Sequence, residues 1–129
     1  MHSMERIRFI EHKEQRVLLL DFRNCTPEQV TALSSQIRAV MAQEPKDSVL
    51  VLADFAGAQF SREAVNRIKE VTALDRPFVK RAAWVGTENL PKVFYDAIRT
   101  FSVREFPVFN TREEALEYLT QPTSSRESA

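Results

Sequence analysis

The sequence predicts a single α/β domain whose sheet of about five strands is mainly parallel and carries about four helices. Its 129 residues suit one domain with one hydrophobic core. From residue 26 onward, apolar runs rich in β-branched residues alternate with helical patterns, and this alternation favours parallel strands joined by right-handed crossovers. The runs LLLDF and VLADF both place Asp-Phe where a strand ends before a helix. Successive strand-to-helix turns are therefore expected to repeat one local structure.

The chain is expected to begin with a β-hairpin. The segments RIRFIEHK and QRVLLLDF are short apolar runs that meet around Lys13 and Glu14, although these are not typical turn residues. We expect residues 1–4 to be flexible and residues 5–120 to form the domain.

The first helix is expected to follow directly. Thr26, Pro27 and Gln29 form a capping-box start, and the helix should end before Pro45. Its apolar stripe consists of Val30, Leu33, Ile37, Val40 and Met41. The next segment, SVLVLADF, is continuously apolar, which is typical of a strand covered on both faces.

A second helix is expected from Ser61, which would be its N-cap, to a point before Pro77. Its inward residues are predicted to be Ala64, Val65, Ile68, Val71 and Leu74. The segment FVKRAAWVG then predicts another strand.

The last third of the chain predicts two more helices and one strand. NLPKVFYDAIRTFS fits a third helix, and FPVFN fits an edge strand because Pro107 cannot donate to a ladder. Thr111 and Glu114 predict a capping box for the final helix. Residues 121–129 are polar without periodicity, so we expect a disordered tail.

Composition argues against several classes of function. Lysine and arginine total 18, as do aspartate and glutamate, so no net field attracts nucleic acid. With only two glycines, phosphate-binding glycine loops are absent, and with two histidines and one cysteine a metal site is disfavoured. No apolar run is long enough to span a membrane. We therefore expect a cytoplasmic protein that is not an enzyme and holds no cofactor or metal.

The ordered segments LLLDFRNCTPEQV, VLVLADFAGAQFSREAV, FVKRAAWVGTENLPKVFYDAIRTFS and FNTREEALEYL resemble the STAS domains (sulfate transporter and anti-sigma factor antagonist), in particular their SpoIIAA-like branch of small bacterial proteins. The resemblance covers roughly residues 5–120. It implies a compact βα superhelix with a regulatory role. In the best-known members, a partner kinase phosphorylates a serine at the start of the helix after the third strand, and binding to that partner is lost.

The sequence departs from the family at that serine. The family motif reads aspartate, serine, any residue, glycine, whereas Arg62 and Glu63 occupy the corresponding region here. Ser61 alone could stand in for the phosphoacceptor. Since serine at a helix start is more commonly a cap, we favour a capping role for Ser61.

Polar residues gather at the predicted carboxyl ends of the strands, where ligands bind in open α/β sheets. Ordinary turn and capping roles are the favoured explanation, because no nucleophile can be paired with a base. The residues are Asp21, Asn24, Asp54, Gly86, Thr87, Glu88 and Asn110. The candidate interaction or ligand residues are Asp21, Asp54, Gly57, Ser61, Arg62 and Thr87.

We expect a non-enzymatic regulatory domain that binds an unidentified protein partner through residues 57–72; a homodimer is compatible with this role. Basic residues surround that segment and the following strand: Arg62, Arg67, Lys69, Arg76, Lys80 and Arg81. The alternative is a small-molecule or lipid-binding domain of the Sec14 type, with an apolar groove beside the third helix. That groove would be bordered by Phe55, Phe60, Phe94, Tyr95 and Phe101.

Overall fold

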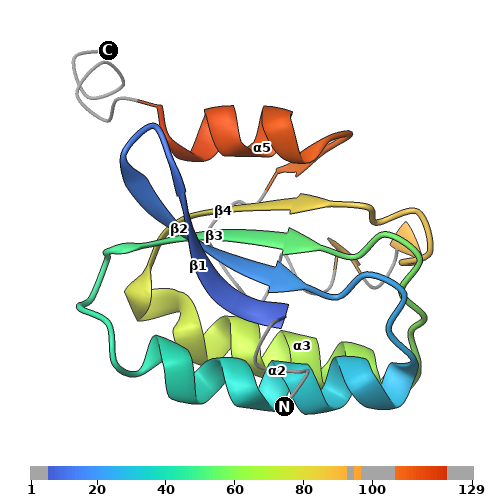
Figure 1. Cartoon of the computed structure of the whole chain (residues 1–129). Helices are drawn as coiled ribbons and strands as arrows, with labels where there is room; N and C mark the ends of the chain where they lie inside the picture. The colour runs from blue at the N-terminus through green and yellow to red at the C-terminus, as the bar shows by residue number, and fades with distance from the viewer. Residues whose placement is uncertain (1–5, 93–94, 97–106, 122–129) are drawn as a thin grey trace.

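The computed structural model describes residues 6–92, 95–96 and 107–121, which form a three-layered α/β arrangement (Figure 1). Five strands form one sheet in the sequential order β1-β2-β3-β4-β5. Only the β1–β2 pair is antiparallel; the other three pairs are parallel. Helices α2 and α3 lie on one face of the sheet and α5 lies on the other. The α/β class and the mainly parallel sheet are thus confirmed.

The opening hairpin is also confirmed. Strand β1 (Ile7–His12) pairs with β2 (Gln15–Asp21) through a two-residue turn, and both turn residues have positive φ: 52° at Lys13 and 65° at Glu14. A two-residue turn with both φ values positive is the type I′ geometry, which matches the twist of the strands. Neither residue is one of those that adopt it at low cost.

We expect Glu14→Gly to raise the free energy of unfolding by up to about 1 kcal/mol, because glycine adopts the positive φ without the steric cost that glutamate bears. Denaturant titration of the variant against the wild type measures the change. Glu11→Gly, in the middle of β1, is the control and should destabilise. A loss of stability in Glu14→Gly would show that this turn is not strained.

Helix α2 (Pro27–Met41) begins with the predicted capping box. Thr26 Oγ1 accepts from the backbone N–H of Gln29, and the Gln29 side chain accepts from the backbone N–H of Thr26. The following strand, β3 (Val49–Asp54), is buried along its whole length, as expected for a strand covered on both faces.

Helix α3 (Arg62–Asp75) differs from prediction at its end. Leu74 was expected to face inward, but it is 51% exposed, and Asp75 is buried instead. Asp75 lies four residues after the buried Val71 and so continues the inward stripe, and Arg38 of α2 neutralises it in an ion pair. Burial raises the pKa of Asp75 even though the hydrogen bond from Arg38 opposes this.

A short 3₁₀ turn, η1 (Arg76–Phe78), leads into β4 (Val79–Val85). Arg81 of β4, placed among surface charges by the sequence, is buried. Its Nη1 donates to the backbone carbonyls of Tyr118, Leu119 and Gln121. These carbonyls lie at the C-terminal end of helix α5 and just after it, so Arg81 holds that helix to the sheet at the end where a cation is favourable.

Strand β5 (Val108–Phe109) is the predicted edge strand, and α5 (Arg112–Leu119) follows it. Thr111 Oγ1 accepts from the backbone N–H of Glu114, as predicted, but the Glu114 side chain accepts from Asn110 instead of completing the capping box at Thr111. The cap is therefore confirmed and the reciprocal bond is displaced by one residue.

Three α-helices are complete among the described residues, against about four predicted. The predicted third helix falls largely outside those residues, although Lys92, Tyr95 and Asp96 have helical backbone. The groove residues Phe94 and Phe101 also lie outside. Of the predicted tail, Gln121 is described and accepts from Arg81, whereas residues 122–129 are not described. Residues 1–4 lie outside as well.

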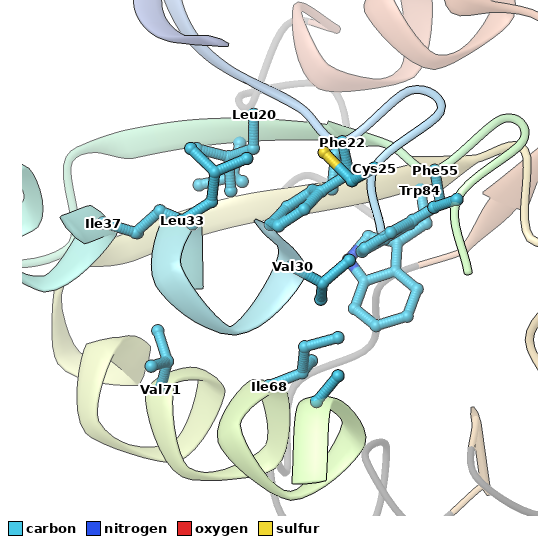
Figure 2. Close-up of a cluster of buried hydrophobic side chains, with 14 of the residues drawn as sticks. Leu20, Phe22, Cys25, Val30, Leu33, Ile37, Phe55, Ile68, Val71 and Trp84 are labelled. Carbon is cyan, nitrogen blue, oxygen red and sulfur yellow. The ribbon is translucent and has the colours of Figure 1, made fainter. Parts of the chain in front are cut away.

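The sheet separates two hydrophobic cores. The larger, between the sheet and helices α2 and α3, contains an aromatic cluster in which Phe55 lies 4.8 Å from both Phe22 and Trp84, measured between ring centroids; it stacks on Phe22 and is tilted against Trp84 (Figure 2). The smaller core joins β2, β3 and β4 to Ala115 and Leu119 of α5. Among the helices of the described ranges, none combines the length and apolar character needed to cross a membrane.

Candidate functional site

Two acidic side chains end adjacent parallel strands. Asp21 ends β2 and Asp54 ends β3, and the two residues are paired in the sheet register. Both are buried, being 8% and 5% exposed. Two carboxylates this close repel each other unless cations offset them.

Arg23 is the main partner of Asp21. Its Nε and Nη2 donate to the two carboxylate oxygens at 3.0 Å each, and its backbone N–H donates to Oδ1 at 3.1 Å. Burial would raise the pKa of Asp21, but the hydrogen bonds and charge of Arg23, with a contribution from Arg112, lower it overall. This pairing therefore stabilises the fold above the pKa of the unfolded chain and is lost as pH falls through the lowered value.

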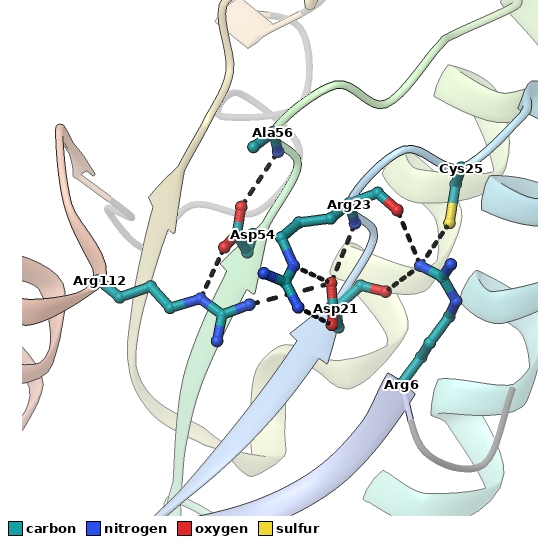
Figure 3. A network of polar contacts seen from close by, with 7 residues as sticks. All are labelled: Arg6, Asp21, Arg23, Cys25, Asp54, Ala56 and Arg112. Atoms are coloured by element: carbon teal, nitrogen blue, oxygen red, sulfur yellow. Dashed lines mark hydrogen bonds and ion pairs between the residues drawn. The ribbon is translucent and has the colours of Figure 1, made fainter. Parts of the chain in front are cut away.

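Arg112, the first residue of α5, is the main partner of Asp54. Arg112 Nε donates to Asp54 Oδ2 at 2.7 Å, and Asp54 Oδ1 accepts from the backbone N–H of Ala56 at 3.1 Å. Arg112 Nη2 lies 3.9 Å from Asp21 Oδ1. Figure 3 shows that two carboxylates and two guanidinium groups thus form one network, here called the edge network: Asp21, Arg23, Asp54 and Arg112.

Arg6 ties the start of β1 to the same edge. Its Nη1 donates to the carbonyls of Asp21 and Arg23 and contacts Cys25 Sγ at 3.2 Å. Cys25 is buried, and this burial raises the pKa of its thiol despite the nearby guanidinium. A buried thiol with a raised pKa packs and does not act as a nucleophile at neutral pH.

A polar cleft of about 390 Å³ opens at the carboxyl edge beside the edge network. It brings together Asp54 and Thr87 of the predicted set. Its lining residues are Asp54, Ala56, Val85, Gly86, Thr87, Glu88, Val108, Phe109, Asn110 and Arg112. Five of these ten residues are among those that the sequence analysis placed at the carboxyl ends of the strands: Asp54, Gly86, Thr87, Glu88 and Asn110.

Gly57 has a backbone role. Its φ is +73°, and a Cβ at this position would lie 2.2 Å from Asn24 Oδ1. The backbone N–H of Asn24 donates to the carbonyl of Ala56. The turns after β2 and β3 therefore pack directly against each other, and Gly57 permits that close approach.

Ser61 and Arg62 lie apart from the cleft, at the start of α3. Ser61 has extended backbone, and its Oγ accepts from the backbone N–H of Ala64 at 3.0 Å, so it is the N-cap that the sequence predicts. Arg62 is exposed on the first turn.

We expect Ser61→Ala to lower the free energy of unfolding by about 1 kcal/mol, and Ser61→Gly by only a few tenths, because glycine lets water reach the freed N–H. Ser61→Asp should keep or raise stability, since aspartate caps well and suits the helix N-terminus. Denaturant titrations of the three variants test the order. Equal stability of Ser61→Ala and the wild type would rule out the capping role.

Sequence reasoning missed the two arginines of the edge network. The pairing of Arg112 could have been predicted in part. A cation in the first turn of a helix interacts unfavourably with the helix dipole, so an acidic partner for Arg112 is expected. Arg23 lies two residues after Asp21, and only the structure shows its side chain folding back onto that carboxylate.

Both strand-end carboxylates are engaged by arginine, and Cys25 is buried. Across residues 6–92, 95–96 and 107–121, no three histidine, cysteine, aspartate or glutamate side chains gather into a group able to hold a metal ion.

Searches of protein-family models, curated proteins and solved structures found no match to this chain.

Proposed function

We propose that this chain is a non-enzymatic regulatory domain that binds a protein partner through α3 and the turn before it. The observation that carries the proposal is the outer face of α3. Along the whole helix this face is exposed, and it ends in Leu74, a large aliphatic side chain that is half exposed. The α3 face consists of Arg62, Glu63, Asn66, Arg67, Glu70 and Leu74.

The α3 face has the mixed chemistry of a protein contact surface. Five polar or charged side chains on it line a shallow groove: Arg62, Glu63, Asn66, Arg67 and Glu70. Arg67 and Glu70 form an ion pair at 2.9 Å. Arginine is enriched at protein interfaces, and an aliphatic group within a polar surface supplies apolar area to a contact.

The carboxyl edge is the less favoured face for binding. Asp54 and Asp21 at this edge already have arginine partners at 2.7 and 3.0 Å, so a ligand that used these carboxylates would first have to break partly buried ion pairs. The side chains of the α3 face are solvated, and a partner could engage them at lower cost.

A relationship to the SpoIIAA-like STAS domains is part of this proposal. The opening hairpin, the sequential strand order and the repeated strand-to-helix turns agree with the βα superhelix that the resemblance implies. Because Ser61 caps α3 and Arg62 follows it, we propose that partner binding is not controlled by phosphorylation in the way that the family motif provides.

The test compares two matched double variants. A partner is first isolated by pull-down from source cells and its affinity for the wild type is measured. Arg62→Glu/Leu74→Ser changes the α3 face, whereas Arg8→Glu/Val108→Ser makes a charge reversal and an aliphatic-to-serine change on exposed residues of β1 and β5. We expect the first to weaken binding at least about tenfold, equivalent to ~1.4 kcal/mol, and the second to have little effect. The reverse order would contradict the proposed face.

Small-molecule binding is a second candidate function, because an apolar cavity of about 90 Å³ lies between the sheet and helices α2 and α3. Phe55, expected to border an apolar groove, lines it, and so does Trp84, against which Tyr95 packs. An unfilled apolar space of this kind takes up small apolar molecules.

A further inference from the structure

An apolar cavity of about 90 Å³ lies under the sheet. A water molecule needs roughly 10–15 Å³ of such space, so about 90 Å³ accommodates a small ring or short chain of roughly six to nine non-hydrogen atoms. The walls are mostly apolar, and Figure 2 shows several of the side chains that form them: Leu20, Phe22, Ile37, Phe55, Ile68, Val71 and Trp84. An apolar ligand would therefore be well matched to the interior.

One charged group in the wall is buried. Asp75 lines the cavity and is only 3% exposed. Its Oδ1 is paired with Arg38 Nη1, but its Oδ2 is buried without a hydrogen-bond partner. A buried carboxylate oxygen without a donor is costly and calls for an explanation.

None of the other polar side chains of the wall, Ser34, Thr72 and Arg76, donates to Asp75 Oδ2. The Ser34 hydroxyl donates to the carbonyl of Val30 at 2.8 Å instead. A bound molecule that carries a donor would complete the site, since apolar pockets commonly use one or two polar groups to orient a ligand.

We propose that this cavity binds a small, mainly apolar molecule with one hydroxyl or amine group, and that Asp75 accepts a hydrogen bond from that group. The inference rests on the second candidate function, ligand binding under the sheet, and adds to it the chemical class of the ligand. It is independent of the contact face on α3.

Two probe molecules of equal size test separately whether the cavity binds a ligand and whether Asp75 accepts a hydrogen bond from it. Cyclohexanol has a hydroxyl donor, whereas cyclohexanone presents only an acceptor. Each is titrated into the ¹⁵N-labelled full chain at pH 8, and binding is followed at the indole N–H of Trp84, the single tryptophan, which lines the cavity. We expect saturable shifts with both probes and at least about tenfold tighter binding of cyclohexanol, as one hydrogen bond to a charged group provides.

Two variants complete the test. In Asp75→Asn the amide both donates and accepts, so the preference for the alcohol should fall to within about twofold. Ala82→Ile adds three carbons to the cavity wall and should abolish binding of both probes while the spectrum stays folded. If either variant fails to fold, the comparison of the two probes on the wild type still decides. Equal affinities would overturn the role of Asp75 alone, and no saturable shift with either probe would overturn ligand binding as well.

Discussion

Gly86→Ala is expected to lower the free energy of unfolding by roughly 3 kcal/mol. Gly86 follows β4 with φ +71°, which disfavours any residue with a Cβ, and the added Cβ would lie 2.4 Å from the backbone nitrogen of Ala56 and 2.7 Å from its Cα. Backbone atoms cannot rotate away, so the turns after β3 and β4 would have to separate. Denaturant titration measures the loss.

Gly57→Ala is the matched control. Its φ is almost the same, but the nearest atom to the new Cβ is Oδ1 of Asn24, the end of a side chain that can turn away. We expect a smaller loss, about 1–2 kcal/mol, from the backbone conformation alone. Equal losses in the two variants would mean that the close approach at Gly86 has no cost of its own.

Asp54→Ala is expected to lower the free energy of unfolding by about 2–3 kcal/mol, somewhat less than the cost of removing one partner of a fully buried ion pair, because Arg112 is partly exposed. The change leaves Arg112 and the backbone N–H of Ala56 without the carboxylate they contact. Circular dichroism during thermal unfolding gives the change in stability. Glu70→Ala is the control: it removes the exposed Arg67–Glu70 ion pair on the surface of α3 and should cost less than about 1 kcal/mol.

A double-mutant cycle shows whether the loss of stability in Asp54→Ala comes from the contact between Asp54 and Arg112. If Asp54 and Arg112 stabilise each other, Asp54→Ala/Arg112→Ala should cost less than the sum of the single variants, because the second change no longer leaves a charge unpaired. Additive losses would contradict the pairing.

Local patterns in the sequence predicted most of the fold. The caps at Thr26, Ser61 and Thr111 depend on residues within three positions, so they could be identified without the rest of the chain. The burial of β3 followed from its continuous apolar run. The edge position of β5 followed from Pro107, which has no N–H to donate.

The errors concern charges whose partners are distant in sequence. The burial of Asp75 and Arg81 was not predicted, because Arg38 lies 37 residues from Asp75 and the carbonyls that Arg81 contacts lie up to 40 residues away. The Asp54–Arg112 pair spans 58 residues. The periodicity of apolar residues does not show which buried acidic residue is paired with a distant arginine. The sequence therefore predicted Asp21 and Asp54 as separate strand-end residues and not as parts of the edge network.

The central claim, that α3 and not the carboxyl edge is the binding face, is tested most directly by hydrogen–deuterium exchange of the full chain with and without its isolated partner. We predict that the partner slows exchange in residues 57–74, with no change in residues 85–88 and 110–114. Protection confined to residues 85–88 and 110–114 would contradict the claim and place the contact at the cleft beside the edge network.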